Sequence, residues 1–414
     1  MKRSDIELMA PAGSYESLMA AIQGEANSVY FGVEQLNMRA KSSNNFSLDD
    51  LKRIVGICNK SGIKSYLTVN TILYDDDIPL MKEIILTAKE NGIVAIIASD
   101  MAAINYAHTL GIELHISTQL NISNIETLRF YSRFADIIVL ARELSLKQIA
   151  NITKIIENEQ IRGPSGQLVK VEIFIHGALC MSVSGKCYLS LHENNLSANR
   201  GACLQICRRA YVVKEKESGN ELEINNEYIM SLKDLSTISF LNKIIEAGVK
   251  VLKIEGRARA PEYVKTVVNC YDEAIHAILK GNYTSEKIKK WQERLASVYN
   301  RGFWDGYYLG RKMGEWSDVY GSKATKRKIY LGKGTNYFTN IKVAEFLLEA
   351  GTLKIGDYIL ITGPTTGMVE TKVREIRVNL KNVSAAKKGE NFSIPVDSIV
   401  RRSDKLYKVV DSKV

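Results

Sequence analysis

The first half of the chain alternates short apolar segments with amphipathic segments of helical period. Eight apolar segments are short enough for buried strands: Glu7–Ala10, Ser28–Phe31, Lys64–Val69, Val94–Ala98, Glu113–Ser117, Asp136–Leu140, Val171–Ile175 and Val251–Ile254. Helical patterns separate them, and two of these end just before Gly62 and Gly92, where glycine commonly terminates a helix. The alternation predicts a parallel sheet, and eight strands favour a closed (β/α)8 TIM-like barrel over an open doubly wound sheet.

The pattern changes after the eighth apolar segment. A long helical pattern, Glu262–Leu279, is followed by a charged one and by a linker rich in aromatic residues and glycine. From Ser322 onward, short strands and turns predict a small antiparallel β-barrel. We therefore expect a TIM-like catalytic domain over residues 1–280, a helical and aromatic linker over 281–321, and a C-terminal β-barrel over 322–414. The segment LKIGDYILITGPTTG in that barrel resembles the second domain of translation factors, which often contacts RNA.

Four of the six cysteines follow the seventh predicted strand, within an insertion that we place at residues 176–225. Cys180, Cys187, Cys203 and Cys207 have the spacing C-x6-C-x15-C-x3-C. Thiolates are soft ligands that suit zinc or iron–sulfur clusters. Zinc sites usually contain C-x2-4-C pairs, so the first gap favours a 4Fe–4S cluster, with zinc as the alternative. The two other readings are unrelated core cysteines and disulfides.

The C-terminal ends of the predicted strands carry polar residues that converge at the barrel mouth, where barrel enzymes place their chemistry. Arg142 and Arg257 are candidates to clamp the carboxylates of a small anionic metabolite. The alternative is that they form ion pairs with neighbouring acidic residues, among them Glu255, which is itself a candidate catalytic residue. His176 is a candidate proton donor or base, and the alternative is a supporting hydrogen bond.

Charge is distributed unevenly along the 414 residues. Residues 322–414 hold 18 Lys and Arg against 9 Asp and Glu, and so carry +9 of the total net charge of +10. Such a concentration favours a surface that binds a polyanion, although a solvated basic face has the same composition. We predict RNA contacts at Lys326, Arg327, Lys328, Arg401 and Arg402.

The composition is that of an ordinary soluble protein, with 45% hydrophobic and 25% charged residues. The apolar runs are far too short to span a membrane. The beginning of the chain shows no signal-peptide pattern. We expect a cytoplasmic protein without membrane contact, and the reducing cytoplasm makes the disulfide reading unfavourable.

The segment EIFIHGALCMSVSGKCYLS, Glu172–Ser190, resembles the signature of peptidase family U32 at all 19 positions. The resemblance extends to Ala10–Gly13, Ile116–Asn121 and Lys253–Val264. Despite the family name, it implies a hydroxylation protein that carries a 4Fe–4S cluster and modifies RNA or a quinone precursor. The likeness is strongest to the tRNA-modifying branch, which implies conversion of the wobble uridine of tRNA to 5-hydroxyuridine with prephenate as co-substrate. A sister branch hydroxylates a cytidine of ribosomal RNA.

Proteolysis is the main alternative activity. The chain contains neither a Gly-x-Ser-x-Gly elbow nor a His-Glu-x-x-His zinc helix. A cysteine protease would pair one thiolate with a histidine, for which Cys180 and His176 are available, but that pair leaves three cysteines unexplained. A further alternative is an RNA-binding factor without catalytic activity, in which the cluster is structural.

Overall fold

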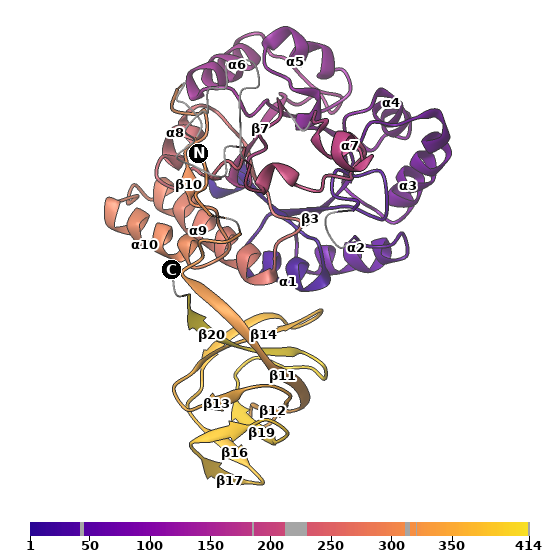
Figure 1. The fold of residues 1–414 in the computed structure, drawn as a ribbon. Coiled ribbons are helices and arrows are strands. Elements are labelled where there is room, and N and C mark those ends of the chain that lie inside the picture. Colours follow the sequence, from indigo (N-terminus) through magenta and orange to yellow (C-terminus); the bar gives the residue numbers. More distant parts are fainter. Residues whose placement is uncertain (42–44, 184–185, 212–229, 311–314, 320, 413–414) are drawn as a thin grey trace, which may run out of the picture.

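The computed structural model describes residues 1–41, 45–183, 186–211, 230–310, 315–319 and 321–412. Figure 1 shows a large part built from strands surrounded by helices, and a smaller part built from strands alone. The smaller part is formed by the last segment of the chain.

Eight parallel strands form the barrel of the large part. They are β1 (Glu7–Pro11), β2 (Ser28–Phe31), β3 (Lys64–Val69), β4 (Ala95–Ala98), β5 (Glu113–Ile116), β6 (Ile137–Val139), β7 (Lys170–Gly177) and β9 (Val251–Ile254). Strand β9 pairs with both β7 and β1 and so closes the ring. The predicted TIM-like barrel is confirmed, and each predicted strand overlaps an observed one.

Helices surround this ring (Figure 1). They are α1 (Tyr15–Gln23), α2 (Asp50–Lys60), α3 (Ile78–Glu90), α4 (Met101–Thr109), α5 (Ile125–Tyr131), α6 (Leu146–Asn158), α8 (Leu241–Glu246) and α9 (Pro261–Leu279). Apolar residues of strands and helices form one continuous core between the two layers. A second, smaller core includes Met9, Tyr30, Tyr66 and Ile97, from alternating strand positions that face the barrel interior. No helix in the described part of the chain combines the length and apolar character needed to cross a bilayer.

Two short strands were not predicted. Strand β8 (Asp234–Ser236) pairs antiparallel with the end of β7, and β10 (Phe303–Trp304) pairs with β8. The helix that follows, α8, begins only at Leu241. Strand β7 has eight residues and β6 only three, so the end of β7 extends past its neighbour. Its backbone groups need another partner there, and β8 supplies it.

The cysteine-rich insertion follows β7, as predicted. Its described residues contain α7 (Leu189–Asn194) and 3-10 turns at Ala198–Arg200 and Ile206–Arg208. Backbone hydrogen bonds attach it to the loops after β2 and β3: Lys41 N–H donates to the carbonyl of Gly201, and Ile72 N–H to that of Asn199. The insertion therefore lies over the C-terminal ends of these strands. Part of the predicted range 176–225 falls outside the described residues.

The smaller part is an antiparallel β-module with its own apolar core, as predicted. Helix α10 (Ser285–Ala296) precedes it. Its strands are β11 (Lys326–Phe338), β12 (Val343–Leu348), β13 (Thr352–Lys354), β14 (Tyr358–Gly363), β15 (Gly367–Lys372), β16 (Ile376–Val378), β17 (Lys381–Val383), β18 (Ala385–Lys387), β19 (Asn391–Pro395) and β20 (Lys405–Asp411).

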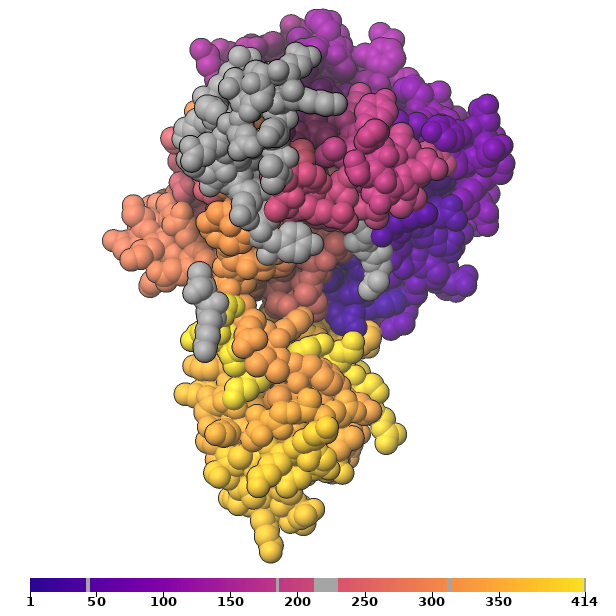
Figure 2. Space-filling view, in the orientation of Figure 1, coloured from indigo at the N-terminus to yellow at the C-terminus, as the bar shows by residue number. Residues whose placement is uncertain are grey.

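Specific bonds join the two parts, which touch in the space-filling view (Figure 2). The side-chain amide of Gln23, at the end of α1, donates to the carbonyl of Thr366 at 2.9 Å and accepts from the Met368 N–H at 2.9 Å. Lys328 forms an ion pair with Glu262 of α9 at 2.7 Å. The β-module is therefore held against α1 and α9 by paired polar groups.

Candidate active site at the barrel mouth

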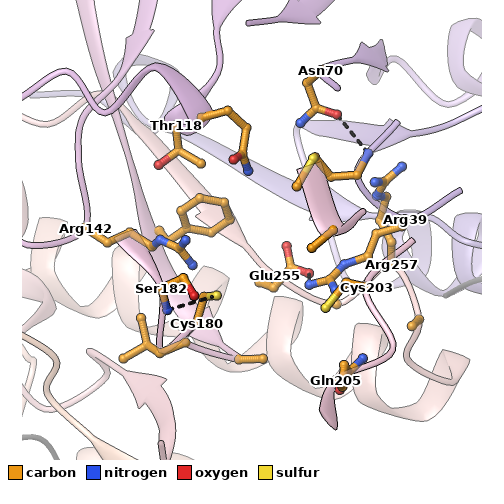
Figure 3. A pocket seen from close by; sticks show the side chains of 18 of the residues that line it. Arg39, Asn70, Thr118, Arg142, Cys180, Ser182, Cys203, Gln205, Glu255 and Arg257 are labelled. Atoms are coloured by element: carbon orange, nitrogen blue, oxygen red, sulfur yellow. Dashed lines mark hydrogen bonds and ion pairs between the residues drawn. The ribbon is translucent and has the colours of Figure 1, made fainter. Parts of the chain in front are cut away.

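A hollow lies where the barrel strands end and the cysteine-rich insertion covers them. Its walls contain all four cysteines of the insertion together with a set of cationic side chains: Arg39, Arg142, Arg208, Lys253, Arg257 and Arg259. With its open mouth it encloses about 1380 Å³. Figure 3 shows Cys180 and Cys203 approaching it from different segments, with Arg142, Arg39 and Arg257 around it. We call this hollow the main pocket.

The four thiols are free and lie near one another. Cys180 is exposed, and Cys187, Cys203 and Cys207 are half-buried. Burial raises the pKa of the Cys207 thiol, and the neighbouring sulfurs of Cys180, Cys203 and Cys187 raise it further, while Arg208 acts against them. Backbone N–H groups point at two sulfurs: Ser182 N–H donates to Cys180 Sγ and Leu189 N–H to Cys187 Sγ, both at 3.4 Å.

Two glycines and one arginine position the insertion. Gly177 and Gly201 have positive φ angles, and a Cβ on them would lie 2.4 Å from the Glu255 carbonyl oxygen and 2.3 Å from that of Asn37, respectively. Arg208 donates to the carbonyl of Leu179 at 2.5 Å and to that of Leu232 at 2.6 Å. The cysteine loops can therefore pass close to the barrel backbone and remain attached to it.

The donor set has the chemistry of iron–sulfur ligation. Four thiols share one pocket, and hydrogen bonds to sulfur of the kind made by Ser182 and Leu189 are among the interactions that tune such clusters. No three His, Cys, Asp or Glu side chains within the described residues have the spacing of a site for one metal ion. Zinc and a 4Fe–4S cluster both take thiolate ligands, so the residue types of this donor set fit either group.

Arg257 is one of the two most buried cations of the main pocket, with an exposed fraction of 5%, the same as that of Lys253. Its Nη1 donates to Asn37 Oδ1 and to Thr68 Oγ1, both at 3.0 Å, so its hydrogen-bond partners are neutral. Burial lowers the pKa of Arg257 to about 10, which leaves it charged at neutral pH. Arg142 lies over the Phe174 ring at 5.7 Å, and no ion pair joins it to Glu143 in the described structure. Both arginines are available to an anionic ligand.

Glu255 has a different partner from the one expected. Its Oε1 lies 2.7 Å from Arg39 Nη2, and its Oε2 accepts from the Tyr30 hydroxyl at 3.1 Å. Burial acts to raise the pKa of Glu255, but Arg39 together with Arg257 and Tyr30 holds it at about 2. The carboxylate is therefore ionised and serves to hold Arg39. The sequence analysis did not single out Arg39. Its position in the loop after the second predicted strand could have indicated it, because loops of this kind reach the barrel mouth.

Gly13 explains how the loop after β1 fits beside Arg257. A Cβ at this position would lie 1.9 Å from the Arg257 carbonyl oxygen, a distance no side chain tolerates. The glycine therefore permits the first and last barrel strands to bring their loops together at the pocket.

Comparison with known proteins decides the family. Residues 13–318, nearly three quarters of the chain, match the sequence model of Peptidase family U32. The chain belongs to peptidase family U32. It is 62% identical over 408 residues to a protein of Porphyromonas gingivalis named collagenase, covering 99% of each chain. It is 30% identical over 366 residues to tRNA hydroxylation protein P1 of Bacillus subtilis, covering 86% of this chain and 83% of that one. It is also 35% identical over 276 residues to a 23S rRNA 5-hydroxycytidine synthase of Escherichia coli, covering 66% of this chain and 40% of that one.

A buried charge network lies under the main pocket of this U32 protein. Lys253, which lines the pocket, places its Nζ 2.7 Å from Glu172 Oε1 and 4.6 Å from the centre of the Tyr30 ring. The other oxygen of Glu172 lies 3.0 Å from His115 Nδ1. Glu172 is fully buried, and it is the first residue of the signature by which the family was recognised. Its role is therefore to hold Lys253 at the pocket floor.

His176 lies behind the pocket wall and does not line it. Its Nδ1 lies 3.3 Å from the Tyr271 hydroxyl, and its ring packs 5.5 Å from that of Phe303. Burial lowers the pKa of His176 to about 3, with a smaller contribution from Arg259, so the imidazole is neutral. This position does not support the predicted role in catalysis and agrees with the alternative, a supporting hydrogen bond.

The predicted RNA-binding residues do not form one patch. Lys326, Arg327 and Lys328 begin β11, whereas Arg401 and Arg402 lie near Gly334 further along the same strand. Seven positions of a strand separate the groups by roughly 20 Å. Lys328 is ion-paired with Glu262 at the junction with the barrel. Arg401 and Arg402 line a surface hollow with Tyr337 and Asn336.

Proposed function

We propose that this U32 protein is an iron–sulfur enzyme of the cytoplasm that hydroxylates RNA, with the wobble uridine of tRNA as substrate and 5-hydroxyuridine as product. The observation that carries the proposal is the meeting of four cysteines and several cations in one pocket at the barrel mouth. The relatives named for tRNA and rRNA hydroxylation add support from the family. The corresponding cytidine of ribosomal RNA is the second nucleotide to examine.

Cys180, Cys187, Cys203 and Cys207 would hold a 4Fe–4S cluster. When bound, such a cluster supplies one-electron redox chemistry. The contribution of the chain is to hold the thiolates from separate loops and to place cations beside them. Arg208 opposes the rise in the pKa of Cys207 and so offsets part of the negative charge that several thiolates bring into one pocket.

Arg142 and Arg257 would bind the carboxylates of an anionic metabolite, for which prephenate is the compound to test. Arg257 has neutral hydrogen-bond partners, whereas Lys253 at the pocket floor is paired with the buried carboxylate of Glu172. Arg39 is neutralised by Glu255. The pocket therefore contains more positive than negative side-chain charge, which suits a dicarboxylate.

Mass spectrometry of tRNA nucleosides tests this function. A strain that lacks the gene should lose 5-hydroxyuridine and its derivatives, and the wild-type gene should restore them. A matched gene encoding Cys203→Ser should not restore them, whereas one encoding Cys58→Ala, at a buried position of α2 that does not line the pocket, should do so. Unchanged tRNA and ribosomal RNA nucleosides in the deletion strain would falsify the proposal.

Proteolysis is a second candidate, because the relative with 62% identity is named collagenase. The geometry argues against a thiol protease: Cys180 lines the pocket, but His176 is buried behind its wall against Tyr271. We expect no hydrolysis of gelatin by protein that has its full metal content. Hydrolysis that is lost in a Cys180→Ser variant and kept in a Cys207→Ser variant would establish the peptidase instead.

A further inference from the structure

We propose that a second, smaller hollow beside the main pocket binds the pyrimidine base of the RNA substrate. The proposal rests on the function proposed above and assigns the base and the metabolite to separate, adjoining sites. The hollow lies at the ends of β3, β4 and β5, where Asn70, Thr71, Asp100 and Gln119 line it. Lys186 and Asn199 of the cysteine-rich insertion also line it.

The two hollows share a wall. Met38, Asn70 and Gln119 line both of them, so ligands in the two sites would lie next to each other. The second hollow encloses about 570 Å³ including its open side, against about 1380 Å³ for the main pocket. This volume falls within the size range of sites for small ligands. In Figure 3, Asn70 lies on the far side of the main pocket from Cys180.

A buried hydroxyl in this hollow lacks a partner. Thr71 has an exposed fraction of 1%, and its Oγ1 makes no hydrogen bond with any described residue. Thr118 lines the main pocket, and its buried Oγ1 also has no hydrogen-bond partner among the described residues. A buried polar group without a partner is unfavourable, and nearly all such groups in folded proteins are satisfied. A ligand that offers a donor or acceptor to Thr71 would remove this penalty.

Some of the other polar side chains in this hollow already form hydrogen bonds within the protein, and others do not. Asn70 is fixed, because its Oδ1 accepts from Met38 N–H at 3.2 Å and its Nδ2 donates to Ser117 Oγ at 3.3 Å. Asp100 is also engaged, since it accepts from Ala102 N–H at 2.9 Å and from Leu73 N–H at 3.1 Å. Across the described structure, the side-chain amides of Gln119 and Asn199 form no hydrogen bond with another residue.

These available groups match the edge of uracil. An amide carries both a donor and an acceptor, and the edge of uracil offers an N3–H donor between two carbonyl acceptors. The Thr71 hydroxyl can serve either role. Apolar side chains of Ile72 and Leu120 provide surfaces for the faces of the ring, and Lys186 at the open side provides a charge for phosphate. A base splayed out of a single-stranded loop presents these features together.

The test compares two RNA probes with the iron-loaded protein. One is an anticodon stem–loop with uridine at the wobble position, and the other has an abasic site there. Wild-type protein should bind the first about tenfold more tightly, because only that RNA fills the second hollow. Thr71→Val, which keeps the shape and removes the hydroxyl, should reduce this ratio by roughly fivefold, as expected for one hydrogen bond. Affinity for the abasic RNA, iron content and prephenate binding should stay unchanged.

Asn199→Ala provides a second variant at a half-buried position, should Thr71→Val fail to fold. Thr109→Val, which removes an exposed hydroxyl at the end of α4, is the matched control and should keep the wild-type ratio. A wild-type ratio in both Thr71→Val and Asn199→Ala overturns the assignment of the second hollow.

The same experiment separates this inference from the proposed function. Protein that modifies RNA normally but keeps the full uridine preference in both variants refutes only the second hollow. Protein that neither modifies nor binds the stem–loops refutes the function and this inference with it. A gelatin-derived peptide that displaces the uridine probe in competition would also overturn the assignment, since it would show that the hollow takes a peptide.

Discussion

Arg39 and Glu255 lie 216 positions apart in the chain and form an ion pair of 2.7 Å at the main pocket. The pair joins the loop after β2 to the end of β9, on either side of β1 in the closed barrel. It also decides the electrostatics of the pocket. Because Glu255 neutralises Arg39, it is not the bonded partner of Arg257, whose charge stays available to a ligand.

The first prediction concerns the four cysteines. Anaerobically purified protein should contain one 4Fe–4S cluster, and Cys203→Ser or Cys207→Ser should lose most of the iron because a thiolate ligand is missing. Iron and sulfide analysis with visible absorption measures this. Cys58→Ala is the control: it removes a buried thiol of α2 and should keep the iron. Stoichiometric zinc without iron in the wild-type protein would contradict the prediction.

The second prediction concerns Arg257. Arg257→Ala should weaken prephenate binding by about 2 kcal/mol, roughly 30-fold, because a charge-assisted contact in a buried site is lost. Arg257→Lys should recover only part of this, since the planar fork is absent. Calorimetric titration measures the affinities. Arg133→Ala, a cation on the ring of Phe130 outside the pocket, should bind as the wild type does. Normal affinity in Arg257→Ala would assign that residue to structure alone.

The third prediction concerns the buried carboxylate of Glu172. Burial acts to raise its pKa, but Lys253 and His115 hold the pKa at about 2. A carboxylate with a lowered pKa in the folded state stabilises the protein above its unfolded pKa of about 4.3 and loses that contribution as the pH falls towards 2. The contribution is about 3 kcal/mol for a difference of about two pKa units. Urea unfolding between pH 7 and pH 2 should show this loss.

Glu172→Gln should be less stable than the wild type by about 3 kcal/mol at pH 7, because Lys253 keeps a buried charge without its partner. Its stability should also fall less steeply with acid. Glu126→Gln, which changes an exposed partner of Arg129, is the control and should follow the wild-type curve. Identical acid dependence in Glu172→Gln and wild type would show that Glu172 does not supply the acid-sensitive stability.

The fourth prediction separates the two basic groups of the β-module. Arg402 is exposed beside Tyr337, whereas Lys328 is ion-paired with Glu262 at the junction with the barrel. Arg402→Ala should lower the slope of log affinity for tRNA against log salt by about 0.7, the value for one phosphate contact on a single strand. Lys328→Ala should leave the slope unchanged and lower the unfolding free energy slightly. Equal slopes for Arg402→Ala and wild type would show that Arg402 makes no phosphate contact.

The local sequence pattern determined the barrel and its insertion. Strands and helices depend on the periodicity of neighbouring residues, and eight apolar segments separated by helical patterns are compatible with few folds. The cysteine cluster could also be predicted from the sequence, because its four members lie within 28 positions of one another: Cys180, Cys187, Cys203 and Cys207. Their place at the barrel mouth followed from the rule that loops after barrel strands carry the chemistry.

The tertiary structure decided which polar side chains share the pocket and which do not. Arg39 lines the pocket and His176 does not, because contacts between distant segments of the chain set the positions of both side chains. The sequence around either residue does not reveal these contacts. The same holds for β8, which exists because β7 extends beyond its neighbour, and for Lys328, whose charge is taken up by Glu262 of α9. Local periodicity sets the elements, whereas contacts between residues far apart in the chain, such as Arg39 and Glu255 at 216 positions, set the site.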